Sequence, residues 1–484
     1  MDARHAMGIH YFFLRIIHVQ FGLIIPFMLK NIPIPIRITL IVVGLVVLAA
    51  IVYNIPFVNE KLSWRVDEVR GQIVSIIRPP DQAVFVPGGQ TTPVSAKGTG
   101  TLPPPQIHIT APASATPTPT ENRPVYTPTV TPTAVPTSVI LKNVKYVDQK
   151  NRWNYCGPAN LTMALNFWGW KGDRDDVAKV IKPGFIDPNK DFISRGRLDL
   201  NVMPYEMADF TTNQTEFKAL VRHGGEIDLL KGLIAAGFPS VIEKGYYEID
   251  TQGKRTWMGH YLFVTGYDDS QNVFIVQDAY YLEKESPRKN LQVKYDDFIE
   301  GWRAFNYLFM VVYPPDREEQ LYSVLGNWGD TAWSNENALT IAEAETAKME
   351  EIDSFFAWFN LGTSHVQMQQ YSEAATAYDR AFTIYASLNQ DNNYRPYRMV
   401  WYQTGPYWAY FYTGRYQDVI NLANVTLATP STGPTLEESL YWRAMAEYAL
   451  GDTISAVNDM RETVRLNPNF AAGLAKFEEW GILP

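Results

Sequence analysis

A proline- and threonine-rich segment divides this chain into parts that cannot share one hydrophobic core. Twelve of the 32 prolines lie between Pro87 and Pro136, and no charged residue occurs between Lys97 and Glu121. Such a segment cannot bury a core of its own, because proline removes backbone donors and the run is poor in large apolar side chains. It favours polyproline II, so we expect a disordered, extended and semi-rigid linker over residues 86–138.

The region before this linker has the composition of a membrane-inserted segment. Residues 38–58 contain no charged residue, and about 20 apolar residues in a helix are enough to cross a bilayer. We expect a transmembrane helix here, retained as an anchor because no small-residue cleavage site follows it. Residues 11–29 form a weaker apolar segment, interrupted by Arg15 and Pro26. They could be a second span, an interfacial helix or the product of an early start codon.

The charges that flank residues 38–58 predict its orientation. Lys30 and Arg37 precede the run without any acidic residue, whereas the residues after it mix both signs. By the positive-inside tendency, the amino-terminal flank is cytoplasmic and everything after the run is extracytoplasmic. We therefore expect a membrane anchor over residues 1–58, a juxtamembrane segment over 59–85, and an exported body beyond.

Size and composition place the rest of the chain among folded proteins. The chain has 484 residues, a net charge of −9 and a single cysteine. One cysteine excludes an internal disulfide, and the lack of a Lys/Arg-rich run in the body argues against a nucleic-acid-binding protein. We expect two globular domains after the linker, over residues 139–315 and 316–484.

The first of these domains is expected to be α+β. A helix is predicted from Cys156 to about Trp168, and another over residues 226–237, with Gly237 as its stop. Strand-like runs follow, and turn residues between two of them predict an antiparallel hairpin. Helices first and a cluster of strands afterwards is an α+β arrangement. The predicted strands cover residues 238–244, 259–269, 272–280 and 306–314.

The last domain carries a helical repeat. Residues 358–381 place Gly362, Tyr378 and other residues at the spacing of a tetratricopeptide repeat, residues 449–470 fit again, and a looser copy surrounds Gly414. Small residues at such spacing let paired helices approach closely and stack on neighbouring pairs. We expect an all-α domain that either binds a peptide or protein partner or braces the domain before it. An aromatic cluster, expected to pack between helices, comprises Tyr402, Tyr407, Trp408, Tyr410 and Tyr412.

The single cysteine stands at a predicted helix start. Cys156 is followed by Gly157 and Pro158, which suit the first turn of a helix. Backbone N–H groups there stabilise a thiolate, so the pKa of this thiol would fall from about 8.5 toward the range of activated cysteines. A buried, unreactive core cysteine is the alternative, and local sequence does not choose between them.

A thiolate catalyst also needs a base, usually histidine. Of the seven histidines, three lie in the membrane region and one in the linker, and His365 falls within the first repeat, where packing is expected. His223 is expected on a solvated surface turn. His260 begins a predicted strand, whose end can project a side chain into a cleft, and is our candidate base.

The base in turn needs an orienting carboxylate or amide. Asp278 ends the strand that is predicted to pair with the strand of His260, whereas the nearer aspartates lie in the turn between them. Gln149 precedes Cys156 by seven residues, and its amide could join the Cys156 backbone N–H in an oxyanion hole. A solvent-exposed glutamine is the alternative at that position.

Together these residues resemble the peptidase C39-like family, the stand-alone branch of the bacteriocin-leader peptidase family C39. The matching stretches are DQKNRWNYCGPANLTMAL, GHYLFVTGYDD and VQDAY. The resemblance implies a papain-like fold. It also implies four roles: nucleophile for Cys156, base for His260, orienting aspartate for Asp278 and oxyanion donor for Gln149.

The chain departs from the leader peptidases in its context. Those usually precede a multi-span export module and an ATPase, whereas this chain has no G-x-x-x-x-G-K-[ST] loop. We therefore expect a membrane-anchored, extracytoplasmic cysteine peptidase of a bacterial cell surface that hydrolyses peptide or amide bonds. No metal or other cofactor is implied, because no cluster of ligand-type residues has metal-binding spacing. The alternatives are an acyltransferase or transamidase on the same fold, and a non-catalytic binding or scaffold protein.

Overall fold

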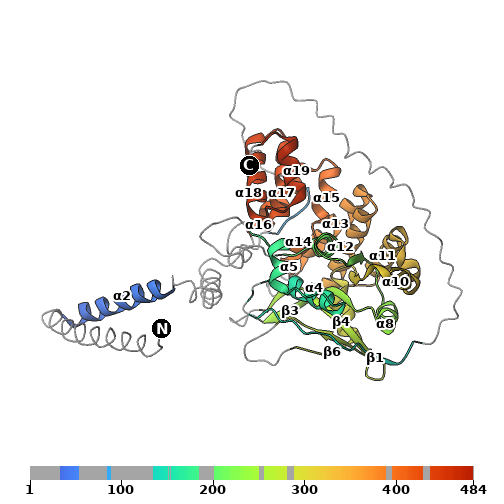
Figure 1. Ribbon diagram of the computed structural model, residues 1–484. Helices are drawn as coiled ribbons and strands as arrows, with labels where there is room; N and C mark the ends of the chain where they lie inside the picture. Colours follow the sequence, from blue (N-terminus) through green and yellow to red (C-terminus); the bar gives the residue numbers. More distant parts are fainter. Residues whose placement is uncertain are drawn as a thin grey trace, which may run out of the picture. The chain divides into compact units, whose positions relative to one another are not determined.

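The structure is a computed structural model, and its two compact units, Met1–Arg70 and Gly71–Pro484, are described separately. The described residues are 33–53, 84–88, 135–150, 152, 154–184, 201–249, 255–280, 288–388, 395–428 and 436–482. Figure 1 gives the arrangement of helices and strands within each unit.

In the first unit, helix α2 spans Ile34–Tyr53. It overlaps the transmembrane helix predicted over residues 38–58. Within the described ranges, however, the structure contains no helix that combines the length and apolarity needed to cross a membrane. The transmembrane helix is therefore not supported by the structure. The weaker apolar segment at residues 11–29, nearly all of the juxtamembrane segment and most of the proline-rich linker lie outside the described residues.

The second unit contains an antiparallel sheet with strand order β2-β7-β3-β4-β5-β6, and β1 pairs with β4. The strands are β1 (Ser138–Ile140), β2 (Lys218–Arg222), β3 (Ser240–Ile249), β4 (Arg255–Asp268), β5 (Val273–Gln277), β6 (Leu291–Lys294) and β7 (Phe309–Tyr313). The four predicted strands correspond to β3, β4, β5 and β7, and the predicted hairpin is that of β4 and β5. The short strands β1, β2 and β6 were not predicted. Their side chains are mostly exposed or half-buried, so they lack the apolar runs that marked the others.

Strand β4 is longer than predicted, and this changes the place of His260. The strand begins at Arg255 rather than at Gly259, because it forms a long ladder with β3 that runs from Ser240 opposite Val264 to Ile249 opposite Arg255. The sequence before Gly259 has no strict alternation of apolar and polar residues, so the extension was missed. His260 therefore lies inside a strand, opposite Lys244, and not at a strand end.

Helices pack on both faces of this sheet, in two separate hydrophobic cores. They are α4 (Cys156–Phe167), α5 (Arg174–Ile181), α7 (Pro204–Gln214), α8 (Ile227–Ala235) and α9 (Tyr295–Arg303). Neighbouring residues of a strand enter opposite cores, as strand geometry requires: Phe263 packs with the residues of α4, whereas Leu262 packs with those of α8. The two predicted helices, α4 and α8, are confirmed, and so is the α+β class.

From residue 315 the described chain is helical. The helices are η1 (Pro315–Arg317), α10 (Glu318–Leu325), η2 (Gly326–Gly329), α11 (Thr331–Thr346), α12 (Glu351–Gln367), α13 (Tyr371–Ser387), α14 (Met399–Tyr402), α15 (Gly405–Tyr412), α16 (Tyr416–Ala428), α17 (Glu437–Ala449), α18 (Thr453–Leu466) and α19 (Ala471–Glu479). Helices α12 and α13 contact each other at Gly362, where the repeat pattern requires a small residue. A Cβ atom on Gly362 would lie only 2.7 Å from the Tyr378 ring.

The helical region packs directly against the α+β domain. Trp257 of β4 stacks on Phe305 and also contacts Phe356 of α12, with ring centroids 6.0 and 5.9 Å away. Asn306 donates to Ser364 Oγ at 2.9 Å, and both side chains are buried. The helices therefore brace the α+β domain, which was one of the two roles expected for them.

Candidate active site

Cys156 is the first residue of α4, as the sequence predicted. Its side chain is half-buried. Although burial raises the pKa of its thiol, the charge and hydrogen bond of His260 lower that pKa, and the backbones of Tyr261 and Gly157 lower it further. A cysteine packed only as a small apolar residue would not have a histidine beside it in this way.

His260 reaches the sulfur from the middle of β4. The side chain is only 4% exposed. Its Nε2 atom lies 2.7 Å from Asp278 Oδ1, which leaves Nδ1 as the ring nitrogen available to Cys156. The imidazole thus lies between the sulfur and a carboxylate.

Asp278 follows directly after β5 and is buried. Besides His260, its Oδ1 accepts the backbone N–H of Tyr280 at 2.9 Å, and Arg288 Nη1 lies 3.3 Å from Oδ2. Its own backbone is fixed as well, because its carbonyl oxygen accepts the Tyr146 hydroxyl at 2.9 Å. These contacts hold the carboxylate in one orientation toward the imidazole.

The charges of the three side chains support one another. Burial alone would raise the pKa of the Cys156 thiol, but the hydrogen bond and positive charge of His260 outweigh burial and lower that pKa. Burial alone would lower the pKa of His260, but the charge and hydrogen bond of Asp278 raise it to about 10. Burial likewise opposes ionisation of Asp278, and the His260 charge lowers its pKa nevertheless. Near neutral pH the site therefore favours a thiolate, an imidazolium and a carboxylate.

Gln149 lies beside the segment that carries Asp278. Its backbone N–H donates to the Ala279 carbonyl oxygen at 2.8 Å. The residue is half-buried, which does not fit the alternative of a solvent-exposed glutamine. Its Oε1 atom is buried and has no hydrogen-bond partner among the described residues. The role of its amide as an oxyanion donor stays a prediction.

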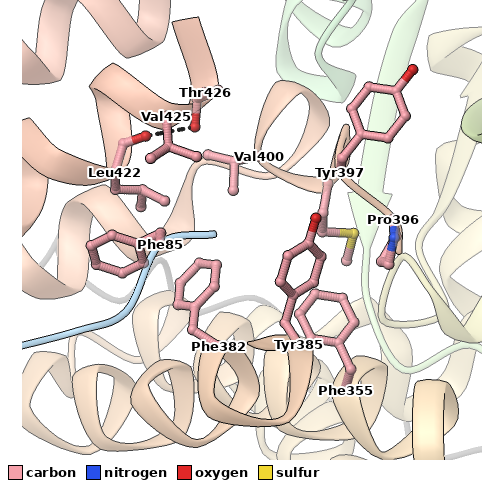
Figure 2. Close-up of a pocket in the computed structure, with 11 residues that line it drawn as sticks. Phe85, Phe355, Phe382, Tyr385, Pro396, Tyr397, Val400, Leu422, Val425 and Thr426 are labelled. Atoms are coloured by element: carbon pink, nitrogen blue, oxygen red, sulfur yellow. Dashed lines mark hydrogen bonds between the residues drawn. The ribbon is translucent and has the colours of Figure 1, made fainter. Parts of the chain in front are cut away.

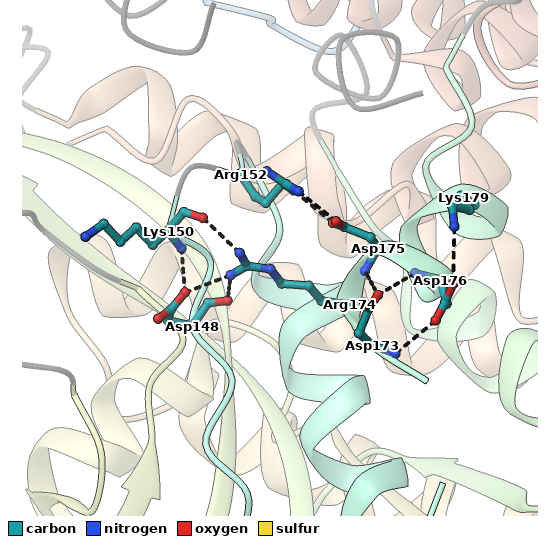
Figure 3. A network of polar contacts seen from close by, with 8 residues as sticks. All are labelled: Asp148, Lys150, Arg152, Asp173, Arg174, Asp175, Asp176 and Lys179. Carbon is teal, nitrogen blue, oxygen red and sulfur yellow. Dashed lines mark hydrogen bonds and ion pairs between the residues drawn. The ribbon is translucent and has the colours of Figure 1, made fainter. Parts of the chain in front are cut away.

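Two arginines hold the loop that carries Gln149 (Figure 3). On one side, Arg174 of α5 donates to the carbonyl oxygen of Asp148, and its Nη1 lies 2.8 Å from Asp148 Oδ1. On the other side, Arg152 forms a bidentate pair with Asp175 of α5 at 2.8 and 2.7 Å. The loop is therefore fixed on both sides of Gln149 to the first turn of one helix.

A buried glutamate beside the site was missed. Glu243 of β3 is 2% exposed and pairs with Tyr261, whose hydroxyl donates to the Val202 carbonyl oxygen at 2.8 Å. Burial and the negative charge of Cys156 raise the pKa of Glu243 well above its usual range, while its contact with Tyr261 opposes this. The raised pKa favours a neutral carboxyl, which would not repel a thiolate at Cys156. The signal was present in the sequence, because Glu243 shares a strand face with the core residue Val241.

Tyr402 of α14 also reaches the site, from the helical region. A Cβ atom on Gly259 would lie 3.0 Å from its ring. The ring also contacts Trp257 and Phe305, with centroids 6.1 and 6.0 Å away. Tyr402 was expected to pack between helices, but it packs against the strand that carries His260.

His223 and His365, which were not chosen as the candidate base, have different surroundings. His223 lies at the bend after β2, as expected, but it is half-buried rather than solvated, and burial lowers its pKa to about 4. His365 hydrogen-bonds through Nδ1 to Gln370 Oε1 at 2.7 Å, which fits the packing role that was expected. Neither is a partner of Cys156 among the contacts of the described residues.

Comparisons with known proteins confirm both resemblances. Residues 141–310 match the model of the Peptidase_C39 like family, and residues 357–387 match that of the tetratricopeptide repeat. The chain therefore joins a papain-like C39 domain to a helical, tetratricopeptide-like region. No curated protein matches the chain.

Two solved structures are similar to part of the chain. A C39-like peptidase from Bacillus anthracis is 19% identical, with a TM-score of 0.28, over 36% of this chain and 97% of its own. Xylellain, a cysteine protease from Xylella fastidiosa, is 18% identical, with a TM-score of 0.24, over 37% of this chain and 86% of its own.

Proposed function

We propose that this chain, which carries a papain-like domain of the peptidase C39-like family, is a cysteine peptidase that hydrolyses peptide or amide bonds. The observation that carries the proposal is the 2.7 Å contact between His260 Nε2 and Asp278 Oδ1, in a site where the His260 charge lowers the pKa of the Cys156 thiol. A thiolate beside a histidine that a carboxylate orients is the arrangement that acyl cleavage requires.

In the proposed reaction the Cys156 thiolate attacks the carbonyl carbon of the scissile bond. The His260 imidazolium then donates its proton to the leaving amine, and a thioester remains on the sulfur. Now neutral, His260 takes a proton from a water molecule that attacks the thioester, and the carboxylic acid product leaves as the thiolate returns. Asp278 keeps the imidazole in the orientation that both transfers need.

Each attack places negative charge on the carbonyl oxygen, which must be stabilised by fixed donors. The backbone N–H of Cys156 at the start of α4 and the side-chain amide of Gln149 are the proposed donors. What supports the second donor is the rigid attachment of its loop to α5 through Arg174 and Arg152.

A thiol-probe experiment tests the proposal. The full chain and its His260→Ala variant are treated at neutral pH with a labelled iodoacetamide, and the labelled site is mapped. Peptides from a cell-envelope digest are then incubated with each protein, and new amino termini are identified by mass spectrometry. We expect labelling at Cys156 and new termini with the unmodified chain, and both lost on substitution.

The matched control is His365→Ala, whose histidine lies in α12 and bonds to Gln370. It should retain labelling and cleavage. A Cys156 that labels equally well without His260, or that labels without producing new termini, would instead favour a binding protein that keeps the fold. Products joined to added amines would indicate acyl transfer.

Membrane attachment through residues 38–58 is a further part of the proposal, and it rests mainly on the charge-free sequence. Apolar side chains of α2 such as Leu45 and Ile51 are more than half exposed, at 59% and 61%. Apolar surface of this kind favours a lipid or protein partner. Alkaline carbonate extraction should leave the chain in the membrane pellet, and protease added to intact cells should digest its body. Release by carbonate would contradict the anchor, and protection from protease would contradict the extracytoplasmic placement.

We also propose that a peptide or protein is the substrate and that the helical repeats can bind a protein partner. The family match of each region supports these classes of partner.

A further inference from the structure

A short segment that precedes the α+β domain in sequence lies against the helical repeats in space. Residues 84–88 are described, and Phe85 within them is only 5% exposed. We infer that the repeats contain a binding pocket for a peptide anchored by an aromatic side chain, and that residues 84–88 of the same chain occupy this pocket. The inference is independent of the proposed peptidase activity.

Phe85 lies among side chains from several separate helices of the repeat region, and together they line a cavity (Figure 2). The Phe85 ring meets the edge of Phe382 of α13, with centroids 4.9 Å apart and planes at 86°, and lies 5.9 Å from the ring of Tyr410. An edge-to-face contact of this kind is a favoured geometry for two aromatic rings. Further residues that line this cavity together with Phe85 are Phe355, Tyr385, Val400, Leu422 and Val425.

The backbone of the segment also binds to the repeats. The Gly88 N–H donates to Asp418 Oδ1 at 3.1 Å, while Oδ2 of the same carboxylate accepts from Arg415 at 2.7 Å. Gly88 has a φ of 64°, a left-handed conformation that favours glycine, and it follows Pro87 in a turn. A buried carboxylate held by an arginine thus receives the turn that follows the aromatic anchor.

The residue between anchor and turn makes little contact. Val86 is 53% exposed, whereas its neighbour Phe85 is buried. In an extended peptide successive side chains point to opposite sides, so only every other residue enters the surface. The pocket therefore fits a peptide with an aromatic residue, any next residue, and then Pro-Gly, which is the order of Phe85 to Gly88.

An occupant on the same chain competes strongly with any free peptide. A tethered segment competes at an effective concentration that the length and stiffness of its linker set. The pocket should therefore bind free peptide weakly until the tethered ring is removed. This behaviour separates a binding pocket with an internal occupant from a piece of ordinary core.

The experiment measures binding of a fluorescein-labelled peptide of residues 81–90, DQAVFVPGGQ, to the full chain by anisotropy. The Phe85→Ala chain should bind it saturably, and the unmodified chain should bind it at least tenfold more weakly. The same peptide with alanine in place of its phenylalanine should not bind. Phe382→Ala added to the Phe85→Ala chain should reduce affinity at least tenfold.

The matched control is Val86→Ala, which shortens an exposed neighbouring side chain. This variant should bind the labelled peptide as weakly as the unmodified chain does. Circular dichroism checks that every variant is folded. No binding by a folded Phe85→Ala chain, or equal binding by both chains, would overturn the inference. A dimer that dissociates on Phe85→Ala would also overturn it, because the occupant would then belong to a second copy.

A second measurement uses only the unmodified chain, in case the Phe85→Ala variant does not fold. Hydrogen exchange of the Gly88 amide should be slow, and a large excess of the free peptide should speed it by displacing the segment. Exchange that is already fast, or that the peptide leaves unchanged, would count against the pocket.

Discussion

The Cys156 sulfur owes its chemistry to one neighbour more than to its helix. Burial opposes ionisation, and the His260 charge and hydrogen bond reverse that effect. The Gly157 and Tyr261 N–H groups add smaller contributions. A thiolate at this position is therefore a property of the pair, and it should disappear when the imidazole is removed.

The first prediction concerns the pH at which this thiol reacts. A free cysteine has a pKa of about 8.5. In the unmodified chain, Cys156 should react with iodoacetamide well below that pH. In His260→Ala, only the smaller contributions of Gly157 and Tyr261 oppose burial, so the pKa of the thiol rises and the inflection of rate against pH moves upward. Alkylation rates between pH 4 and 10 measure both, and a curve unmoved by the substitution would contradict the coupling.

The second prediction concerns Asp278→Asn. The Asp278 charge raises the pKa of His260 to about 10, and without it burial lowers that pKa. The imidazolium is then lost at lower pH, so the alkaline limb of kcat/KM moves to lower pH and kcat/KM falls by about 10²–10⁴. Asp268→Asn, at the end of β4, is the control. An alkaline limb that stays in place would remove Asp278 from the mechanism.

At the scale of elements, helix α5 positions a loop that contributes no triad residue. Arg174 and Arg152 tie the residues on each side of Gln149 to the first turn of this helix, and a capping box at Asp173 and Asp176 fixes that turn (Figure 3). Oxyanion donors act only when held in place before the charge develops. The helix should therefore affect rate through orientation.

The third prediction follows for Arg174→Ala. Freed from α5, the Gln149 loop should lose its fixed orientation, and kcat should fall by about 10–10², less than the ~10²–10³ expected for removing an oxyanion donor outright. KM and the alkylation rate of Cys156 should hardly change, because the thiolate is set by His260. Lys179→Ala is the control, since its ion pair with Asp176 on the same helix is exposed. A parallel loss of thiol reactivity would point to general unfolding instead.

At the scale of the whole molecule, the α+β domain and the helices share a core. Trp257 of β4 lies in the same cluster as Phe356 and Phe359 of α12, and Tyr402 contacts the strand of His260. The two regions cannot separate without exposing these large aromatic rings to water, which is unfavourable. We therefore expect the two regions of residues 139–482 to unfold together.

The fourth prediction tests this coupling with Ser364→Ala. The change leaves the buried Asn306 amide without its acceptor, which should cost about 1–3 kcal/mol of the free energy of unfolding. Helix loss by circular dichroism and exposure of Cys156 to a thiol reagent should shift to lower temperature together. Thr376→Ala, exposed on α13, is the control. Helices that melt while Cys156 stays protected would show that the two regions are independent.

Part of this protein could be read from its sequence, because the relevant signals are local. The helix that starts at Cys156 follows from its first-turn residues, and the hairpin of β4 and β5 follows from alternating apolar runs around a turn. That hairpin already brings His260 and Asp278 to neighbouring strands. The small residues of the repeats likewise predict closely paired helices.

The rest was decided by contacts between residues far apart in the chain. The pKa of Glu243 is raised because the sheet buries it near Cys156, Tyr402 lies near the site because α14 packs on β4, and Phe85 is buried because the repeats cover it. Local patterns record the preferences of a segment for helix or strand. They do not record which distant surface will exclude water from a side chain, and that exclusion sets both burial and charge.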